Sequence, residues 1–225
     1  RPTGESGDFE KANFPIGVEG GKTSTCPTQN LMEAYDMKDG TPFVWNNQSN
    51  PYDNRDPRMK YTIVCNEMKW PVDPVEIWEG GTNGLPLQNA TTTGYYLKKY
   101  VNNTISFEAG STVTKKQHNW VLFRYGEILL NYAEAMINAF HDPNYKDAVY
   151  NMSAREAVNQ IRGRTNISLP GFPSDITEKD FVKRLKNERR VELAFEGHRF
   201  WDVRRWKELG QTANIYGVKI TKNNE

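Results

Sequence analysis

One segment constrains the fold more than any other. Between residues 120 and 140, apolar side chains recur every three or four positions, at Leu122, Tyr125, Leu129, Tyr132, Ala133, Met136 and Phe140. This spacing places them on one face of an α-helix. We therefore predict a long helix over residues 119–140 that buries this apolar stripe.

Two further helices begin at residues suited to capping. Ser153 is followed three residues later by Glu156, the spacing of a capping box, and the buried face of this helix would carry Ala157, Val158 and Ile161. Thr177 and Asp180 have the same spacing, and Gly197 offers a stop for the third helix, which carries Phe181, Leu185 and the apolar residues of 191–195. Helices of this length joined by loops pack as antiparallel pairs.

The first half of the chain has a different texture. Residues 1–115 are rich in Gly, Pro, Asn, Asp and Thr, with short apolar stretches such as residues 59–65, which is typical of loops and short strands. Such a segment has few ways to bury its apolar residues alone. We therefore predict a mainly α fold and a single domain over residues 1–225, in which helices at 119–207 form a platform for the loop-rich segment 1–115.

Composition narrows the possible partners. The chain has 29 Lys and Arg against 28 Asp and Glu, so its formal net charge of +1 argues against nucleic acid as the main partner. Aromatic residues make up 12% of the chain, which favours a folded core despite the mean hydropathy of −0.78. No apolar run reaches the ~20 residues of a membrane-spanning helix. Because the sequence begins without Met, we expect a fragment or a processed product.

No motif predicts a cofactor or a metal. The histidines, at 118, 141 and 198, do not form an HExxH pattern, and Cys26 and Cys65 do not form a CxxC pair, so no zinc ligand set is visible. A disulfide between the two cysteines stays open. The carboxylate pairs in residues 36–40 and 53–56 fit turns better than an EF-hand loop, so calcium is possible but unsupported.

Aromatic residues in polar loops are the strongest sign of a binding site. A pyranose ring stacks its C–H face on an aromatic ring, while its hydroxyls need amide or carboxylate partners. We predict that Trp45 is the stacking platform, and that Tyr52 or Trp78 closes the other side. The hydroxyl partners would be Asn46, Asn47 and Gln48. The alternative is that these aromatic residues, and Trp70 with them, anchor loops to the helices.

Five segments in chain order carry a resemblance to a known family. They are residues 27–31 (PTQNL), 52–58 (YDNRDPR), 123–135 (FRYGEILLNYAEA), 157–162 (AVNQIR) and 187–202 (NERRVELAFEGHRFWD). Together they resemble the C-terminal region of the SusD/RagB family, surface nutrient-binding lipoproteins of Bacteroidetes. The similar region covers about residues 25–207. Family members are longer, with a signal peptide, a lipid-bearing cysteine and N-terminal helical repeats.

The resemblance implies both a fold and a function. The fold would be tetratricopeptide-like helical pairs packed with a loop-rich region containing short strands. The protein would bind oligosaccharides at the outer membrane, where the full-length protein is lipid-anchored, and deliver them to a SusC-like TonB-dependent transporter without catalysis. The motifs at 55–58 and 188–199 look structural and would lock loops to helices through ion pairs.

Two other functions stay open. Abundant carboxylates together with aromatic loops would also suit a secreted carbohydrate-active hydrolase, whose acid and nucleophile are defined by their separation in space and not in sequence. Alternatively, the helical face could grip the transporter while the chain contacts no sugar, as a pure protein-interaction module.

Overall fold

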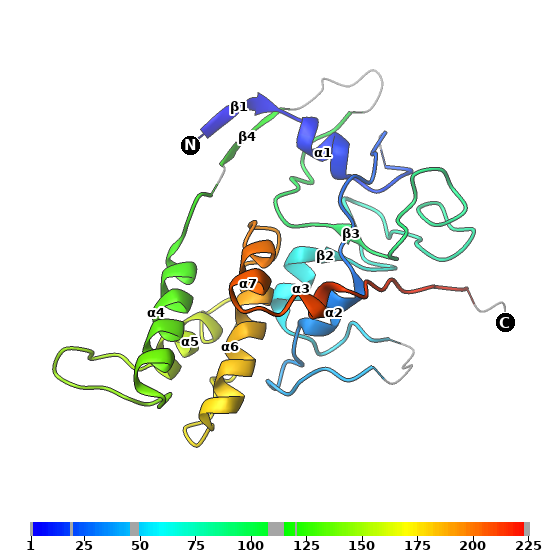
Figure 1. Cartoon of the computed structure of the whole chain (residues 1–225). Helices are drawn as coiled ribbons and strands as arrows, with labels where there is room; N and C mark the ends of the chain where they lie inside the picture. The colour runs from blue at the N-terminus through cyan, green and yellow to red at the C-terminus, as the bar shows by residue number, and fades with distance from the viewer. Residues whose placement is uncertain (1, 19, 46–49, 108–114, 120, 223–225) are drawn as a thin grey trace. The chain divides into compact units, whose positions relative to one another are not determined.

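The computed structural model describes residues 2–18, 20–45, 50–107, 115–119 and 121–222 (Figure 1). The chain divides into two compact units. Unit 1 comprises residues 1–32, 59–120 and 210–225, and unit 2 comprises residues 33–58 and 121–209. Residues 33–58, from the loop-rich half of the sequence, therefore belong with the helices. The single domain over residues 1–225 stays a prediction.

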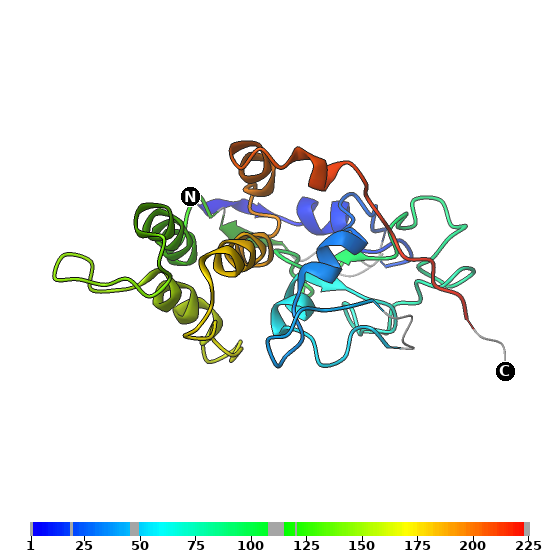
Figure 2. The same ribbon diagram turned by 60° about the horizontal axis from the view of Figure 1, so that its bottom comes forward.

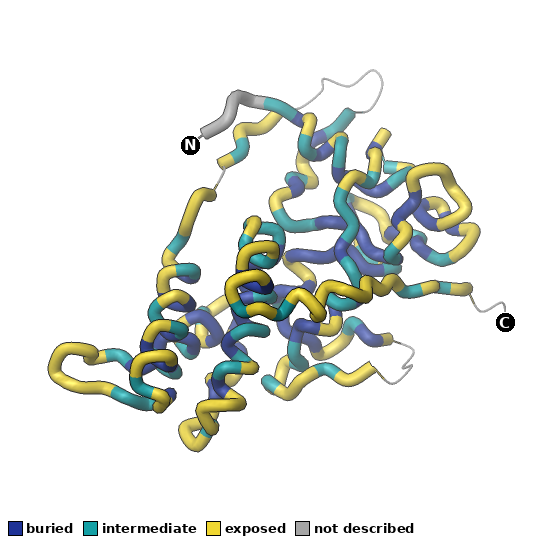
Figure 3. Tube along the Cα trace, viewed as in Figure 1, coloured by how far each residue is buried: buried dark blue, intermediate teal, exposed yellow. Residues whose placement is uncertain are grey.

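Among the described residues of unit 2, the core is formed around helices α4 (Tyr125–Phe140), α5 (Ala154–Arg162), α6 (Glu178–Glu192) and α7 (Arg199–Arg205). Both views show α4, α5 and α6 side by side (Figures 1 and 2). Buried and exposed positions alternate along α4 and α6 (Figure 3). Of the predicted stripe, Leu129, Ala133 and Met136 are buried, whereas Leu122 and Tyr125 are exposed. Their shared core contains Leu129, Leu130, Ala133, Met136, Ile137, Ala154, Ala157, Val158, Ile161, Phe172, Phe181, Leu185 and Leu193.

The boundaries of the first predicted helix need correction. Helix α4 begins at Tyr125 and not at residue 119, because Arg124 is extended, with φ −148°. The Arg124 guanidinium donates to the carboxylates of Glu192 and Glu196, which fixes the chain in an extended conformation before the helix. The periodic pattern therefore overruns the helix at its start.

The two predicted caps are confirmed. Ser153 Oγ accepts from the Glu156 N–H at 3.1 Å, and the Glu156 carboxylate accepts from the Ser153 N–H at 2.8 Å. Thr177 Oγ1 accepts from the Asp180 N–H at 3.2 Å. The predicted stop at Gly197 is wrong, since α6 already ends at Glu192 and the chain passes through turns before reaching the left-handed Gly197 (φ +83°).

The described residues of unit 1 form two small antiparallel sheets. Strand β1 (Pro2–Ser6) pairs with β4 (Lys116–Asn119), and β2 (Ile63–Val64) pairs with β3 (Tyr96–Leu97). Helix α1 (Asp8–Asn13) follows β1. Helices α2 (Gln29–Ala34) and α3 (Pro57–Thr62) each run from one unit into the other, as does the 3-10 turn η1 (Leu209–Thr212).

The apolar stretch 59–65 is only partly the predicted strand. Residues 59–62 are helical, and only Ile63 and Val64 are extended. Pro57 sits at the first helical position, where its fixed φ is favourable, and Asp56 Oδ1 accepts from the Arg58 N–H at 2.9 Å. This local start signal overrides the strand composition that follows it.

The described part of the chain contains no helix with the length and apolarity needed to cross a membrane. Within the same residues, no group of three or more His, Cys, Asp or Glu side chains converges as a metal site. No disulfide joins Cys26 to Cys65.

Candidate functional site

Residues 41–55 of unit 2, which we call the aromatic loop, are held at their base by one buried arginine. The Arg55 guanidinium donates to the Pro51 carbonyl at 2.8 Å and to the Tyr35 carbonyl at 2.7 Å. The Lys38 N–H donates to the Asn54 carbonyl at 2.7 Å. These bonds join the segment entering the loop to the segment leaving it, so the base of the loop is closed.

Arg55 also supports the aromatic side chains. Its guanidinium carbon lies 3.6 Å from the centroid of the Phe43 ring, a cation–π contact. The Phe43 and Trp45 rings meet edge to face, with centroids 6.3 Å apart at 64°. Trp45 is 38% exposed. The buried guanidinium of Arg55 thus supports Phe43, and Phe43 supports the solvent-exposed indole of Trp45.

The predicted site residues have different outcomes. Trp45 is accessible, as a stacking platform must be. Tyr52 is half-buried in the same loop, where its N–H donates to Asn50 Oδ1 at 3.1 Å. Asn46, Asn47 and Gln48 lie outside the described residues. The contacts that these residues make to a sugar stay predictions.

The other two loop tryptophans belong to unit 1. Trp78 is half-buried, and Lys222 Nζ lies 4.8 Å from the centroid of its ring. Trp70 is 6% exposed, with Lys98 Nζ 5.1 Å from its ring. Trp70 is therefore a core residue, in line with the alternative that some of these aromatic residues anchor loops.

Beneath the aromatic loop, a buried ion-pair network centres on Arg58. Its guanidinium pairs with Asp56 at 2.7 Å, with Glu188 and, at 2.9 Å, with Glu192. All four side chains are buried. We predicted that the motifs at 55–58 and 188–199 lock a loop to a helix through ion pairs. This prediction is confirmed, because Asp56 and Arg58 directly follow the aromatic loop and Arg58 pairs with Glu188 and Glu192 on α6.

Other arginines complete the network. Arg162 pairs with Glu188 at 2.8 Å, and Glu192 pairs with Arg124 at 2.7 Å and Arg164 at 2.8 Å. Burial alone would raise the pKa of Glu192, but the hydrogen bond from Arg164 and the charge of Arg58 outweigh burial and lower this pKa to about 2. The pKa of Glu188 is lowered in the same way, since Arg58 and Arg162 offset the effect of burial.

We did not predict from the sequence that Phe43 and Arg55 support Trp45. Phe43 and Trp45 are two residues apart, so in an extended segment their side chains share a face. That spacing could have predicted the contact between Phe43 and Trp45. No sequence pattern predicts the contact between Arg55 and Phe43, because these residues are twelve positions apart and their contact depends on how the loop closes.

The chain matches the family model described as the SusD family over residues 4–225. It is 37% identical to SusD-like protein P38 of Formosa agariphila over 91 residues, covering 38% of this chain and 16% of P38. A 120-residue match to SusD-like protein P2 of the same organism is 29% identical and covers 51% of this chain and 22% of P2.

Solved structures agree with the sequence matches. A SusD-like protein from Bacteroides fragilis has a TM-score of 0.76 and 26% identity, covering 97% of this chain and 45% of that one. A SusD-like carbohydrate binding protein from the same species has a TM-score of 0.74 and 24% identity, covering 93% and 41%. This chain therefore spans less than half the length of these relatives. The prediction of a mainly helical, SusD-like fold is confirmed, and the chain belongs to the SusD family.

Proposed function

We propose that this chain forms part of a non-catalytic, cell-surface protein that binds oligosaccharides and passes them intact to a SusC-like TonB-dependent transporter. The observation that carries the proposal is an exposed tryptophan, Trp45, braced from below in a chain of the SusD family. The solved relative described as carbohydrate binding supports the choice of ligand class.

The binding step follows from ring chemistry. A sugar places its C–H face on the indole of Trp45, while its hydroxyls bond to the amides of Asn46, Asn47 and Gln48. Tyr52 contributes from the same loop, whereas Trp78, the alternative predicted from the sequence, belongs to unit 1. The contacts of Phe43 and Arg55 hold the platform before the ligand arrives, which lowers the ordering entropy lost on binding.

Two buried carboxylates of unit 2, Glu188 and Glu192, do not fit the role of a catalytic acid. A glycoside hydrolase needs a general acid with a raised pKa beside the bond that it cleaves. Glu188 and Glu192 instead have lowered pKa values and are buried in ion pairs with arginines. They stay ionised at neutral pH, which suits them to holding the aromatic loop on α6.

The first test concerns Trp45. The 225-residue chain is screened on a glycan array, and the strongest hit is titrated by calorimetry against Trp45→Ala. We expect the affinity to fall about 30-fold, the value of ~2 kcal/mol typical of an anchor residue. Trp201→Ala is the matched control, because Trp201 is a 66% exposed tryptophan of the same unit outside the aromatic loop. Unchanged affinity in Trp45→Ala would remove Trp45 from the site.

Transfer to a transporter needs a separate test. The chain is co-expressed with a SusC-like transporter, and the two are co-purified with and without the glycan hit. We expect a complex that forms in both conditions and leaves the glycan at its original length by mass spectrometry. Shortened glycan in the presence of pure chain would instead support a hydrolase.

A further inference from the structure

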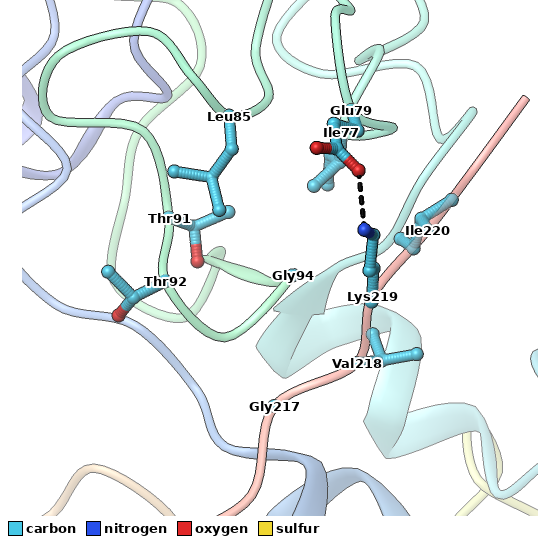
Figure 4. Close-up of a pocket in the computed structure, with 10 residues that line it drawn as sticks. All are labelled: Ile77, Glu79, Leu85, Thr91, Thr92, Gly94, Gly217, Val218, Lys219 and Ile220. Atoms are coloured by element: carbon cyan, nitrogen blue, oxygen red, sulfur yellow. Dashed lines mark ion pairs between the residues drawn. The ribbon is translucent and has the colours of Figure 1, made fainter.

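Unit 1 contains a pocket of about 360 Å³ (Figure 4), and no residue proposed above to contact glycan is among those that line it. One wall comes from residues 77–94 and the other from the C-terminal segment 217–220. The lining residues are Ile77, Glu79, Leu85, Thr91, Thr92, Gly94, Gly217, Val218, Lys219 and Ile220. The volume is at the lower end of the range of small-molecule sites, ~300 Å³ and above.

The C-terminal wall is held in place by backbone hydrogen bonds at every second residue. The Tyr216 carbonyl accepts from the Gln29 N–H at 2.8 Å, the Val218 N–H donates to the Thr93 carbonyl at 2.9 Å, and the Ile220 carbonyl accepts from the Glu79 N–H at 2.9 Å. This period of two is that of an extended strand. The wall is therefore built into unit 1.

Gly94 lets the two walls approach each other. Its φ is +79°, and a Cβ at this position would lie 2.6 Å from both the Cγ1 and the carbonyl oxygen of Val218. A larger residue would push the C-terminal segment away. The pocket thus depends on a close backbone approach that glycine permits.

The apolar side chains of the lining are aliphatic, and none of the lining residues named above is aromatic. Ile77, Leu85, Val218 and Ile220 supply the apolar surface. Leu85 is an exposed large hydrophobic residue, 49% accessible, and its side chain is drawn on the side of the pocket opposite Lys219 (Figure 4). Aliphatic side chains bury methyl and methylene groups well, but they offer no flat ring for a sugar to stack on. The apolar part of the ligand is therefore aliphatic.

An ion pair lies at the rim. Lys219 Nζ lies 2.7 Å from Glu79 Oε2, and the bond joins the two walls (Figure 4). The two side chains are 72% and 55% exposed, so the pair contributes little to stability and can be exchanged at little cost. A ligand carrying one ammonium and one carboxylate replaces this pair with two charge-assisted pairs and leaves the net charge of the rim unchanged.

We propose that this pocket binds an α-amino acid with a branched aliphatic side chain. The ligand ammonium donates to the Glu79 carboxylate, the ligand carboxylate accepts from the Lys219 ammonium, and the side chain lies among Ile77, Leu85 and Ile220. This binding is independent of the glycan contacts proposed for the aromatic loop.

The test is an NMR titration of the ¹⁵N-labelled chain with L-leucine, followed at the amides of residues 77–94 and 217–220. We expect saturable shifts at these amides, and at least tenfold weaker binding in Glu79→Gln and in Lys219→Met. Lys69→Met is the charge-matched control, because Lys69 is an exposed lysine of unit 1 that does not line the pocket, and its affinity should equal that of the wild type.

Changing the ligand separates recognition from any effect on folding. N-acetyl-leucine lacks the ammonium, so it should bind the wild type about tenfold more weakly than leucine does and lose nothing more in Glu79→Gln. Three results would overturn the proposal: no shifts at about 20 mM leucine, above the ~1 mM dissociation constant of weak binding; equal affinity for glycine; or an N-acetyl-leucine affinity as strong as that of leucine.

Discussion

The aromatic loop and the C-terminal wall of the pocket are both held in place, but by different interactions. The loop is closed by the buried guanidinium of Arg55 and rests on ion pairs between Arg58 and carboxylates of α6. The wall is held by backbone hydrogen bonds and by the absence of a side chain at Gly94. Charged side chains hold the aromatic loop, whereas backbone hydrogen bonds and close packing hold the pocket wall. Different substitutions should therefore disturb the loop and the wall.

The largest effect is expected from Arg58→Met. This substitution leaves three buried carboxylates, those of Asp56, Glu188 and Glu192, without their shared cation. Breaking a buried ion pair from one side costs about 3–5 kcal/mol, and we expect a loss of this size in the free energy of unfolding, measured with urea. Arg204→Met removes an exposed arginine of α7 and should cost less than about 0.5 kcal/mol. Equal costs would mean that the network does not hold unit 2 together.

Acid should weaken unit 2 selectively. The pKa of Glu192 is about 2 in the folded chain against an ordinary value of 4.5, so the folded state binds this proton less well than the unfolded state does. The stabilisation is therefore complete above about pH 5 and is lost as the pH falls toward 2. The difference corresponds to about 3 kcal/mol. Urea unfolding between pH 7 and pH 2.5 measures it, and Glu192→Gln should flatten the profile.

Gly94→Ala should disturb the pocket wall and leave the ion-pair network intact. Alanine is strained at positive φ by about 1–2 kcal/mol, and its Cβ would also collide with Val218. Gly80→Ala is a matched control, since Gly80 has φ +92° and a Cβ added there would meet no atom within 4 Å. We expect Gly94→Ala to cost more than Gly80→Ala and to speed hydrogen exchange at the Val218 amide. Identical exchange in the two variants would argue against a close-packed wall.

The helices could be predicted from sequence because their signals are local. Ser153 with Glu156, and Thr177 with Asp180, define caps within four residues, and the apolar stripe of α4 is a property of one segment. The predicted helix boundaries are wrong where a contact with a distant residue determines the backbone conformation. Arg124 is extended because carboxylates about seventy positions away hold it, and no pattern around residue 124 contains that information.

The candidate sites show the same division. Trp45 could be nominated from its polar loop, and its exposure agrees with that choice. Trp70 occurs in a similar loop and is buried, so local composition does not separate the two. The pocket of unit 1 could not be predicted at all, because its walls join residues 77–94 to residues more than 120 positions away.

We expect the smallest effect on stability from Trp45→Ala. A small effect would indicate that Trp45 serves binding and not folding. Trp45 meets Phe43 edge to face but is exposed, so removing it should cost about 0.5 kcal/mol or less in urea unfolding. Phe43→Ala should cost more, because Phe43 also packs on the guanidinium of Arg55. Yet Trp45→Ala should weaken glycan binding by about 30-fold. A side chain that matters for binding and hardly for folding is held in place for its ligand, whereas a large loss of stability in Trp45→Ala would make it an anchor of the loop.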